Sequence, residues 1–186
     1  MIHLIFDTET TGLPKDWSAP TSDIDNWPRL VQLSTVLTNG HDKVEYDFII
    51  RPDGFEIPKE ASDIHGVTTE RAKKEGLGLG FVLGLFKVFV KSSDVIVAHN
   101  LDFDRKIVGA ELHRLGSGVE FEALLATKKV YCTMKKSISG NDKWPKLIEL
   151  YQRLFNEDFG DAHNALGDAR ACERCYFELI KEEIKK

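Results

Sequence analysis

Cysteine is scarce in this chain: 3 of its 186 residues are cysteines, too few and too uneven in number for a disulfide framework. Free thiols are typical of a reducing compartment, and no charged leader precedes the first predicted strand, so we expect a cytoplasmic protein. Cys172 and Cys175 stand three residues apart within a predicted helix, where they share one face. No second pair of ligands accompanies them, so we expect core or edge residues rather than a zinc or redox site.

A long hydrophobic run and an excess of positive charge are also missing. The most apolar stretch, residues 81–90, is short and interrupted by Lys87, which argues against a membrane-spanning helix and a membrane partner. The 25 lysines and arginines face 30 aspartates and glutamates, a formal net charge of −5. This balance argues against general adhesion to polyanions, but it leaves room for an acidic site that binds phosphate through metal ions.

Length and patterning predict one α/β domain over residues 1–186. A hydrophobic content of 42% is ordinary for a globular protein, and a chain of this length buries a full core. Three strands come first, two of them joined by the Asn39-Gly40 turn, and helices then alternate with two more strands, which predicts a mixed sheet. The first predicted strand begins at Ile2, further strands cover residues 29–38, 43–51, 94–98 and 130–134, and helices cover 58–66, 70–75, 80–91, 103–115, 119–126, 145–156 and 164–184.

Two carboxylates follow the apolar start of the first strand. Side chains alternate along a strand, so Asp7 and Glu9 leave the same face about 7 Å apart. Acids that converge at the end of a buried strand repel each other and lose hydration, and no lysine or arginine precedes Lys15. A divalent cation would compensate them. Alternatively, the strand ends at the surface and both acids simply face water.

Further carboxylates stand where an α/β fold places its sites. Asp102 and Asp104 follow the strand predicted at 94–98 and begin the next helix, at the carboxyl end of a strand. We expect Asp102 to act as the helix N-cap, which leaves Asp104 to face the cleft. Asp168 lies near the start of the last predicted helix, and His163 precedes it on a loop from which it can bend over the same cleft. A lone histidine beside a helix start is otherwise a surface or capping group.

Three segments, 6–12, 99–104 and 163–168, carry these residues in order, and together they resemble the motifs of the DEDDh 3′–5′ exonucleases. A sister group has a tyrosine four residues before the last aspartate; here that position is Asn164, so the histidine version is present. The resemblance covers essentially the whole chain. It implies a ribonuclease H-like fold, with a five-stranded mixed sheet of three antiparallel and two parallel strands flanked by helices, in a single exonuclease domain.

The resemblance also implies roles for individual residues. The acids would hold two Mg²⁺ or Mn²⁺ ions, about 3.5–4 Å apart in two-metal enzymes, and His163 would take the proton from the attacking water. Segment 64–68 resembles the part of the family that lies beside the 3′-terminal nucleotide, although His65 could be only a turn residue and Phe103 only a core residue. The expected catalytic residues are Asp7, Glu9, Asp104, His163 and Asp168, with the four acids as metal ligands. The expected substrate contacts are Thr8, Thr10, Thr11, Gly12, His65, Gly66, Val67, Asn100 and Phe103.

The substrate class stays open at this point. We expect hydrolysis from the 3′ end of DNA, preferably single-stranded, in proofreading or DNA repair. The alternatives are an RNA-trimming exoribonuclease of the same family, and a non-catalytic nucleic-acid-end binder or subunit of a DNA polymerase. The glycines at 76, 78, 80 and 84 match no motif, and their spacing does not fit a dinucleotide fingerprint. The basic residues that either track phosphates or are simply solvated are Arg105, Lys106, Lys128, Lys129, Lys135 and Lys136.

Overall fold

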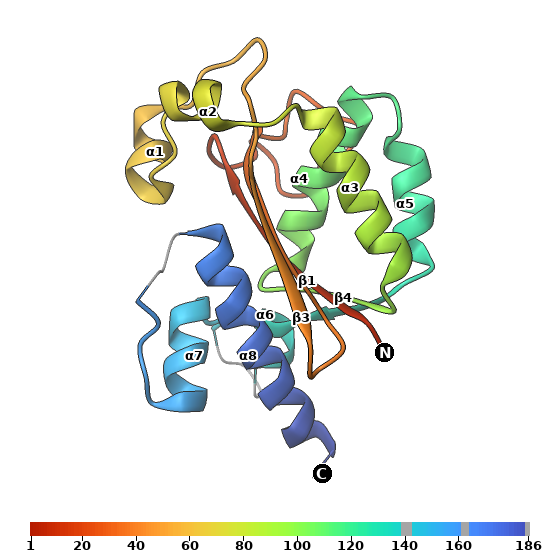
Figure 1. The fold of residues 1–186 in the computed structure, drawn as a ribbon, viewed down its shortest axis with the longest axis vertical. Coiled ribbons are helices and arrows are strands. Elements are labelled where there is room, and N and C mark those ends of the chain that lie inside the picture. The colour runs from red at the N-terminus through yellow and green to blue at the C-terminus, as the bar shows by residue number, and fades with distance from the viewer. Residues whose placement is uncertain (139–142, 161–163, 185–186) are drawn as a thin grey trace.

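A five-stranded mixed sheet forms the centre of the fold, in a computed structural model that describes residues 1–138, 143–160 and 164–184 (Figure 1). Its strand order is β3-β2-β1-β4-β5. The first three strands pair antiparallel, β4 pairs parallel with β1, and β5 pairs parallel with β4. The strands are β1 (His3–Thr10), β2 (Leu30–Thr38), β3 (Lys43–Ile49), β4 (Val95–Ala98) and β5 (Lys129–Cys132). The predicted α/β architecture is therefore confirmed.

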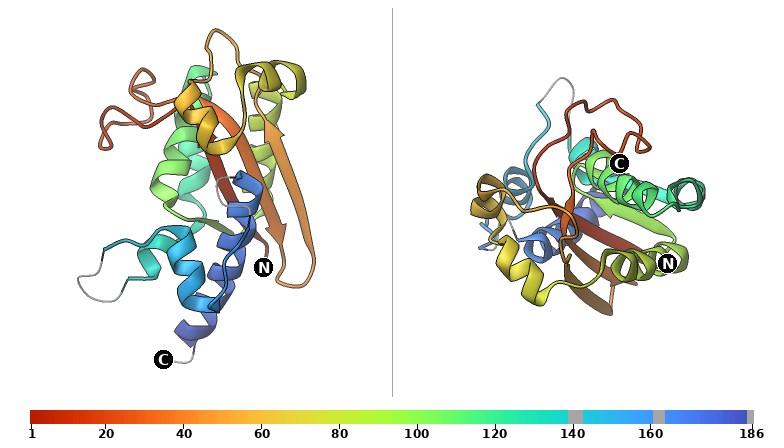
Figure 2. Two further views of the ribbon diagram at one scale, coloured as in Figure 1. Left: turned by 90° about the vertical axis from the view of Figure 1, so that its left-hand side faces the viewer. Right: turned by 90° about the horizontal axis from the view of Figure 1, so that it is seen from above.

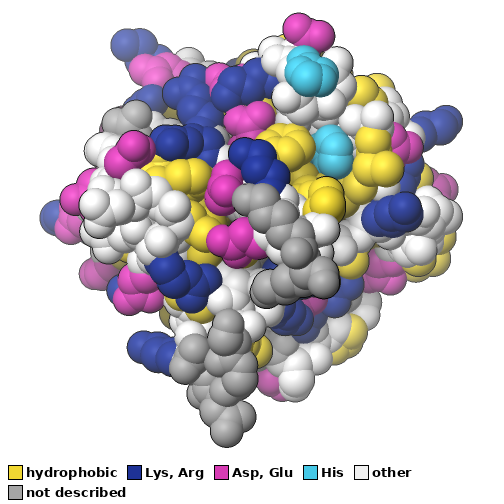
Figure 3. Space-filling view, turned by 90° about the horizontal axis from the view of Figure 1, so that it is seen from below, with side chains coloured by type: hydrophobic (Ala, Val, Ile, Leu, Met, Phe, Trp, Pro, Cys, Tyr) yellow, Lys and Arg dark blue, Asp and Glu magenta, His cyan; other side chains and the backbone are white. Residues whose placement is uncertain are grey.

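Helices cover both faces of this sheet. They are α1 (Lys59–His65), α2 (Thr69–Glu75), α3 (Leu79–Ser92), α4 (Leu101–Arg114), α5 (Gly118–Ala126), α6 (Thr133–Lys136), α7 (Leu147–Phe155) and α8 (Ala165–Ile184). Helices α3, α4 and α5 lie on one face, and α7 and α8 lie on the other (Figures 1 and 2). No described helix combines the length and the apolar composition that crossing a bilayer requires. On the surface seen from below, basic side chains are interspersed with acidic ones (Figure 3).

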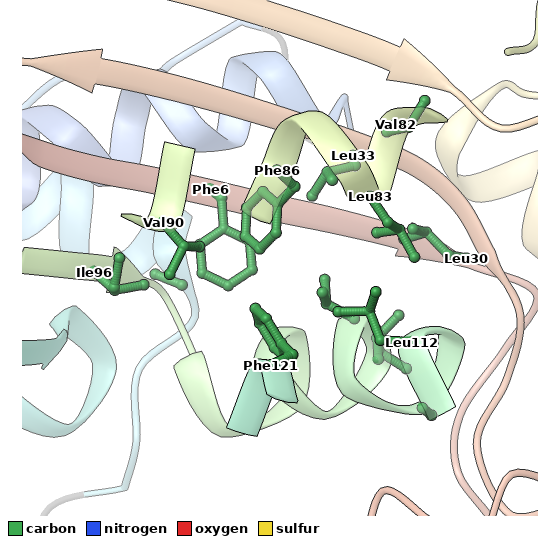
Figure 4. Close-up of a cluster of buried hydrophobic side chains, with 14 of the residues drawn as sticks. Phe6, Leu30, Leu33, Val82, Leu83, Phe86, Val90, Ile96, Leu112 and Phe121 are labelled. Carbon is green, nitrogen blue, oxygen red and sulfur yellow. The ribbon is translucent and has the colours of Figure 1, made fainter. Parts of the chain in front are cut away.

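The central strand β1 is buried on both faces. Leu4 and Phe6 point into one core, where the Phe6 ring lies 5.1 Å from the ring of Phe86 on α3 (Figure 4). Ile5, between them, belongs to a second core that β1 forms with α7 and α8. Burial on two faces explains why the chain opens on a nearly continuous apolar run. The predicted core position of the free thiols on α8 is confirmed by the buried Cys172 and Cys175.

Two strands end earlier in the structure than the sequence predicted. β3 ends at Ile49 rather than at residue 51, and the chain then makes a single parallel bridge between Ile50 and Leu77. β5 ends at Cys132 rather than at residue 134, because the chain coils into the one-turn helix α6. Coiling buries the adjacent side chains of Thr133 and Met134 together, which the alternating faces of a strand would separate.

The glycine-rich stretch is partly explained by packing. The helix predicted at 80–91 is present as α3, and Gly76 lies just before it. A Cβ on Gly76 would lie 2.3 Å from the Ala72 carbonyl oxygen and 2.6 Å from the Arg51 backbone nitrogen. Glycine is therefore required where these two stretches of backbone meet. A Cβ on Gly78, Gly80 or Gly84 would meet no atom within 4 Å, so packing does not explain those three.

Candidate active site

Three carboxylates converge where β1 meets α8. Asp7 and Glu9 stand two residues apart on β1, and Asp168 lies in the first turn of α8. Carboxylate oxygens of these three residues lie within 4.8 Å of one another. Asp104, in the first turn of α4, is 2% exposed and accepts a 2.7 Å hydrogen bond from Thr8 Oγ1. The structure thus brings together the four acids expected from the sequence.

The position of Asp104 follows from the unequal lengths of β1 and β4. Their parallel pairing ends where Ile5 faces Val97, so among the described strands none borders the rest of β1 on that side. After β4, the chain turns at Asn100, which adopts the left-handed conformation with φ 66°, and α4 begins. The first turn of α4 therefore approaches the free edge of β1, where Thr8 meets Asp104.

The prediction that Asp102 caps α4 is wrong. The cap position is Asn100, whose side chain makes no capping hydrogen bond, and Asp102 lies inside the first turn. Its carboxylate pairs with Lys135 on α6 and, at 2.9 Å, with Arg105. The hydrogen bond from Lys135 is the main reason that the pKa of Asp102 is lowered. The helix begins at Leu101, one residue before Asp102, and the carboxylate instead meets a partner 33 residues away in the sequence.

Asp7, Glu9 and Asp104 are poorly compensated as carboxylates. Burial raises the pKa of Asp7 well above its ordinary value, and repulsion by the neighbouring carboxylates raises it further. Burial raises the pKa of Glu9 to about 8, with added repulsion from Asp168 and Asp104. Burial also raises the pKa of Asp104 to about 7, although the Thr8 hydrogen bond opposes this change. The folded protein therefore favours protonation of these groups unless positive charge is supplied.

A divalent cation fits this donor set. Among the described residues no lysine or arginine forms an ion pair with Asp7, Glu9 or Asp104. The donors are all carboxylate oxygens, and hard oxygen ligands suit Mg²⁺ and Mn²⁺. The space between Asp7, Glu9, Asp104 and Asp168 therefore has the charge and the ligand type of a magnesium or manganese site.

A cavity of about 500 Å³ adjoins the acids. It lies between the end of β1 and α1, and Figure 2 (left) shows α1 and the first turn of α8 on the face turned toward the viewer. Its walls include Leu13 and Ile64, both strongly exposed. The residues expected to contact substrate that line it are Thr8, Thr10, Thr11, Gly12, His65 and Phe103. Six of the nine residues expected to contact substrate therefore line one cavity.

The other three expected contacts shape the neighbourhood of the cavity without lining it. Gly66 ends α1 in the left-handed conformation, with φ 74°. Val67 is 1% exposed in a core cluster, and its backbone nitrogen donates a 3.1 Å hydrogen bond to Nδ1 of His65. Burial lowers the pKa of His65 despite an opposing effect of the Thr10 backbone, so its ring is neutral at neutral pH. His65 is thus the last residue of α1 and a wall of the cavity, whereas Asn100 forms the turn before α4.

The predicted general base, His163, lies outside the described residues. Asn164, the next residue, accepts hydrogen bonds from the backbone nitrogens of Leu166 at 3.1 Å and Gly167 at 3.4 Å. These bonds satisfy free donors in the first turn of α8, the turn that carries Asp168.

Sequence reasoning missed His99, the first residue of segment 99–104. Its ring nitrogens lie 3.0 Å from Thr133 Oγ1 and 3.0 Å from the Pro145 carbonyl oxygen. The carbonyl only accepts, so Nε2 carries the proton and Nδ1 accepts from the threonine hydroxyl. Burial lowers the pKa of His99 to about 4, so the ring is neutral. The His99 ring connects the end of β4 to the starts of α6 and α7 by these two hydrogen bonds. Its position as the first residue of segment 99–104 was the signal in the sequence that could have identified it.

Several of the basic residues considered for phosphate contact have partners within the protein. Lys128 donates to two backbone carbonyls near the end of α3, and Lys129 lies beside it at the amino end of β5, away from the acids. Lys106 donates a 2.7 Å hydrogen bond to the carbonyl oxygen of Trp17, and Lys136 pairs with a glutamate of α8. Acidic side chains also interrupt the basic ones on the face in Figure 3. A continuous basic track is therefore not seen on that face.

A family model described as RNase_T exonuclease matches residues 4–176. The chain belongs to this exonuclease family. The predicted relationship to the DEDD-type 3′–5′ exonucleases, within the ribonuclease H-like superfamily, is thereby confirmed. This family depends on divalent metal ions, in agreement with the acidic cluster.

Solved structures of exonuclease I share the fold of this exonuclease chain. A structure of exonuclease I interpreted in terms of processivity superposes with a TM-score of 0.75, at 16% identity, over 97% of this chain and 41% of that one. The E. coli enzyme with a dT13 oligonucleotide gives a TM-score of 0.74 at 16% identity, over 97% of this chain and 41% of that one. Its zinc-bound complex with single-stranded DNA gives 0.72 at 16% identity, over 98% and 40%. This chain therefore spans about two-fifths of the length of these neighbours. No curated protein matches it in sequence.

Proposed function

We propose that this chain, as a single domain over residues 1–186, is a metal-dependent 3′–5′ exonuclease that acts on single-stranded nucleic acid, preferably DNA. The observation that carries the proposal is the meeting of four carboxylates from β1, α4 and α8 beside a cavity of nucleotide size. Ionised acids in this place destabilise the metal-free fold, because burial raises the pKa of Asp7, Glu9 and Asp104. Family membership supports the same activity.

The acids would hold two divalent ions. Asp7, Glu9 and Asp168 provide the oxygens that lie within 4.8 Å of one another, and Asp7 would be shared between the ions. Asp104 would complete the second set, directly or through water, with its orientation fixed by the Thr8 hydroxyl. Bound ions of this kind neutralise the acids and stabilise charge on the attacking and leaving oxygens of a phosphodiester.

The remaining steps fall to the protein. The cavity beside Thr10, Gly12 and His65 would hold the 3′-terminal nucleotide, so that its phosphate lies over the acids. His163, immediately before α8, would accept the proton of the attacking water, for which an ordinary histidine pKa near 6.5 is suited. This assignment rests on the sequence motif.

The proposed preference for single-stranded DNA rests on the structural similarity of this chain to exonuclease I. Exonuclease I has been solved with dT13 and with dA16, which supports a single-stranded substrate for this chain. An exoribonuclease remains the alternative, because contacts to a 2′-hydroxyl decide between RNA and DNA. The further alternative of a polymerase-bound subunit gains no support from the described residues or from the comparisons.

The test is an assay on single-stranded DNA and RNA of equal sequence, labelled at the 5′ end, with Mg²⁺ or Mn²⁺ and with EDTA. A ladder that shortens from the 3′ end only with metal is expected. Asp7→Asn should lower turnover by more than about 100-fold, because it removes a metal ligand. Asp102→Asn is the matched control, since Asp102 pairs with Lys135 outside the cluster. Degradation that survives EDTA, or an active Asp7→Asn variant, would contradict the proposal.

A further inference from the structure

Trp17 is an exposed aromatic residue whose ring contacts Phe103, a lining residue of the cavity. It lies on the loop between β1 and β2, which projects beside α4 (Figure 2), and it is 52% exposed. Its ring centroid lies 5.6 Å from that of Phe103, with the ring planes tilted by 42°. Phe103 in turn lines the cavity. Trp17 therefore extends the apolar wall outward, on the α4 side of the acids.

The loop holds Trp17 in a fixed place. The backbone nitrogen of Asp16 donates to Asn26 Oδ1 at 2.7 Å, and Asn26 Nδ2 donates to the Asp16 carbonyl oxygen at 2.9 Å. The Asp16 carboxylate accepts a 2.8 Å hydrogen bond from the backbone nitrogen of Ser18. Lys106 on α4 donates to the carbonyl oxygen of Trp17 at 2.7 Å. Trp17 is thus anchored on both sides, and a ligand that binds it does not have to order the loop.

A large, rigidly held and half-exposed indole suits a flat apolar ligand. A base that stacks on an aromatic side chain gains affinity whatever its sequence, because every base has a π-face. Phe103 lines the cavity and its ring contacts that of Trp17, so a path out of the cavity along its α4 side runs past the Phe103–Trp17 pair. A strand whose terminal nucleotide fills the cavity would leave it along this path.

We propose that Trp17 stacks on the base of the nucleotide next to the 3′-terminal one, and so favours polynucleotide chains over mononucleotide esters. This inference rests on the proposed exonuclease function. It adds a substrate contact that no motif of the sequence predicted, and it assigns to Lys106 a positioning role through the Trp17 carbonyl rather than a contact with phosphate.

The experiment compares two substrates, one with several nucleotides and one with a single nucleotide. One is a single-stranded DNA tetranucleotide, and the other is the p-nitrophenyl ester of thymidine 5′-phosphate, which has no second base. Trp17→Ala should raise KM for the tetranucleotide about 5- to 150-fold, the range expected for loss of one stacked base. The kcat/KM of Trp17→Ala for the ester should stay within about twofold of the wild-type value. Trp17→Phe should restore most of the affinity for the tetranucleotide, because a phenyl ring also stacks on a base. Phe81→Ala, which removes a 61% exposed aromatic on α3, is the control and should change neither substrate.

Each departure from this pattern has a distinct meaning. An unchanged KM for the tetranucleotide in Trp17→Ala, with normal ester hydrolysis, overturns the stacking role and leaves the exonuclease function standing. Equal losses on both substrates overturn it as well, because they show that the change disturbs the cavity itself. A Trp17→Phe variant as defective as Trp17→Ala excludes stacking. A wild-type protein that hydrolyses neither substrate refutes the proposed function and this inference with it.

Discussion

Replacing Asp104 with asparagine should stabilise the metal-free protein, and by more at pH 8 than at pH 5. Asp104 is 2% exposed, and burial raises the pKa of its carboxyl from 3.8 to about 7. Between these values the folded protein keeps a proton that the unfolded chain has released. Since the unfolded state then binds fewer protons, the free energy of unfolding falls as pH rises through this window.

The size of the effect follows from the shift. One pKa unit corresponds to about 1.4 kcal/mol, so ionisation at this site lowers the stability of the wild type by about 4 kcal/mol at pH 8. At pH 5, which lies only about one unit above the pKa of the carboxyl in the unfolded chain, the loss is about 2 kcal/mol. Asparagine keeps the oxygen that accepts the Thr8 hydrogen bond and cannot ionise. The stability gain of Asp104→Asn should therefore be about 2–3 kcal/mol larger at pH 8 than at pH 5.

Urea unfolding followed by circular dichroism in EDTA measures this difference. Asp102→Asn is a matched control on the same helical turn: its pKa is lowered by Lys135, so the ionised form stabilises the fold and its removal should give no gain at pH 8. His99 titrates in both proteins and cancels in the comparison. A gain that does not grow from pH 5 to pH 8 would refute the conclusion that burial raises the pKa of Asp104.

Metal binding, the proposed base and one glycine give three further tests. Because the pKa of Glu9 is about 8, Mn²⁺ binding at pH 7.5 should release protons, and the affinity for Mn²⁺ should fall about tenfold or more from pH 8 to pH 6. Calorimetry in buffers of different ionisation enthalpy measures both the proton release and the affinity. Binding that does not depend on pH would contradict the raised pKa of Glu9. His163→Ala should lower kcat by about 10²–10⁴-fold with metal affinity unchanged in the same calorimetry, and an unchanged kcat would remove His163 from the mechanism. Gly76→Ala should lower the free energy of unfolding by about 1–3 kcal/mol, because its Cβ would lie 2.3 Å from the Ala72 carbonyl oxygen. Gly84→Ala, in open space within α3, should instead raise it by up to about 1 kcal/mol in the same urea titration, and equal effects of the two changes would refute the packing argument.

Local patterns were sufficient for the parts of the site that a single element carries. The two-residue spacing of Asp7 and Glu9 is enough to place them on one face of a strand, and the structure has their oxygens within reach of one ion. The position of Asp104 after a buried strand was equally readable, because α/β folds collect side chains at the carboxyl ends of strands. The order of the three motifs then gave the family.

Contacts between distant segments could not be read in the same way. Asp102 resembles an N-cap in its local sequence, but Lys135 lies 33 residues further on and pairs with it only because α6 folds back beside α4. Trp17 lies in a loop with no pattern, and its neighbour Phe103 is on another element. The hydrogen bond from Thr8 to Asp104 spans 96 residues, so a threonine expected to touch substrate also orients an acid. Tertiary packing decided each of these roles.

The alternation of β1 links the hydrophobic cores to the site. Ile5 packs with α8 on one face, and Asp7 and Glu9, two and four residues on, continue that face toward the first turn of α8. Phe6 packs on the opposite face, and Thr8 continues it to meet α4. A slip of β1 by one residue would exchange both sets and separate the acids from Asp168. Full burial of one large apolar side chain contributes about 1.5–3 kcal/mol, so about two such side chains offset the cost of one ionised acid, about 4 kcal/mol. The apolar half of β1 thus holds like charges together at its other end until cations bind.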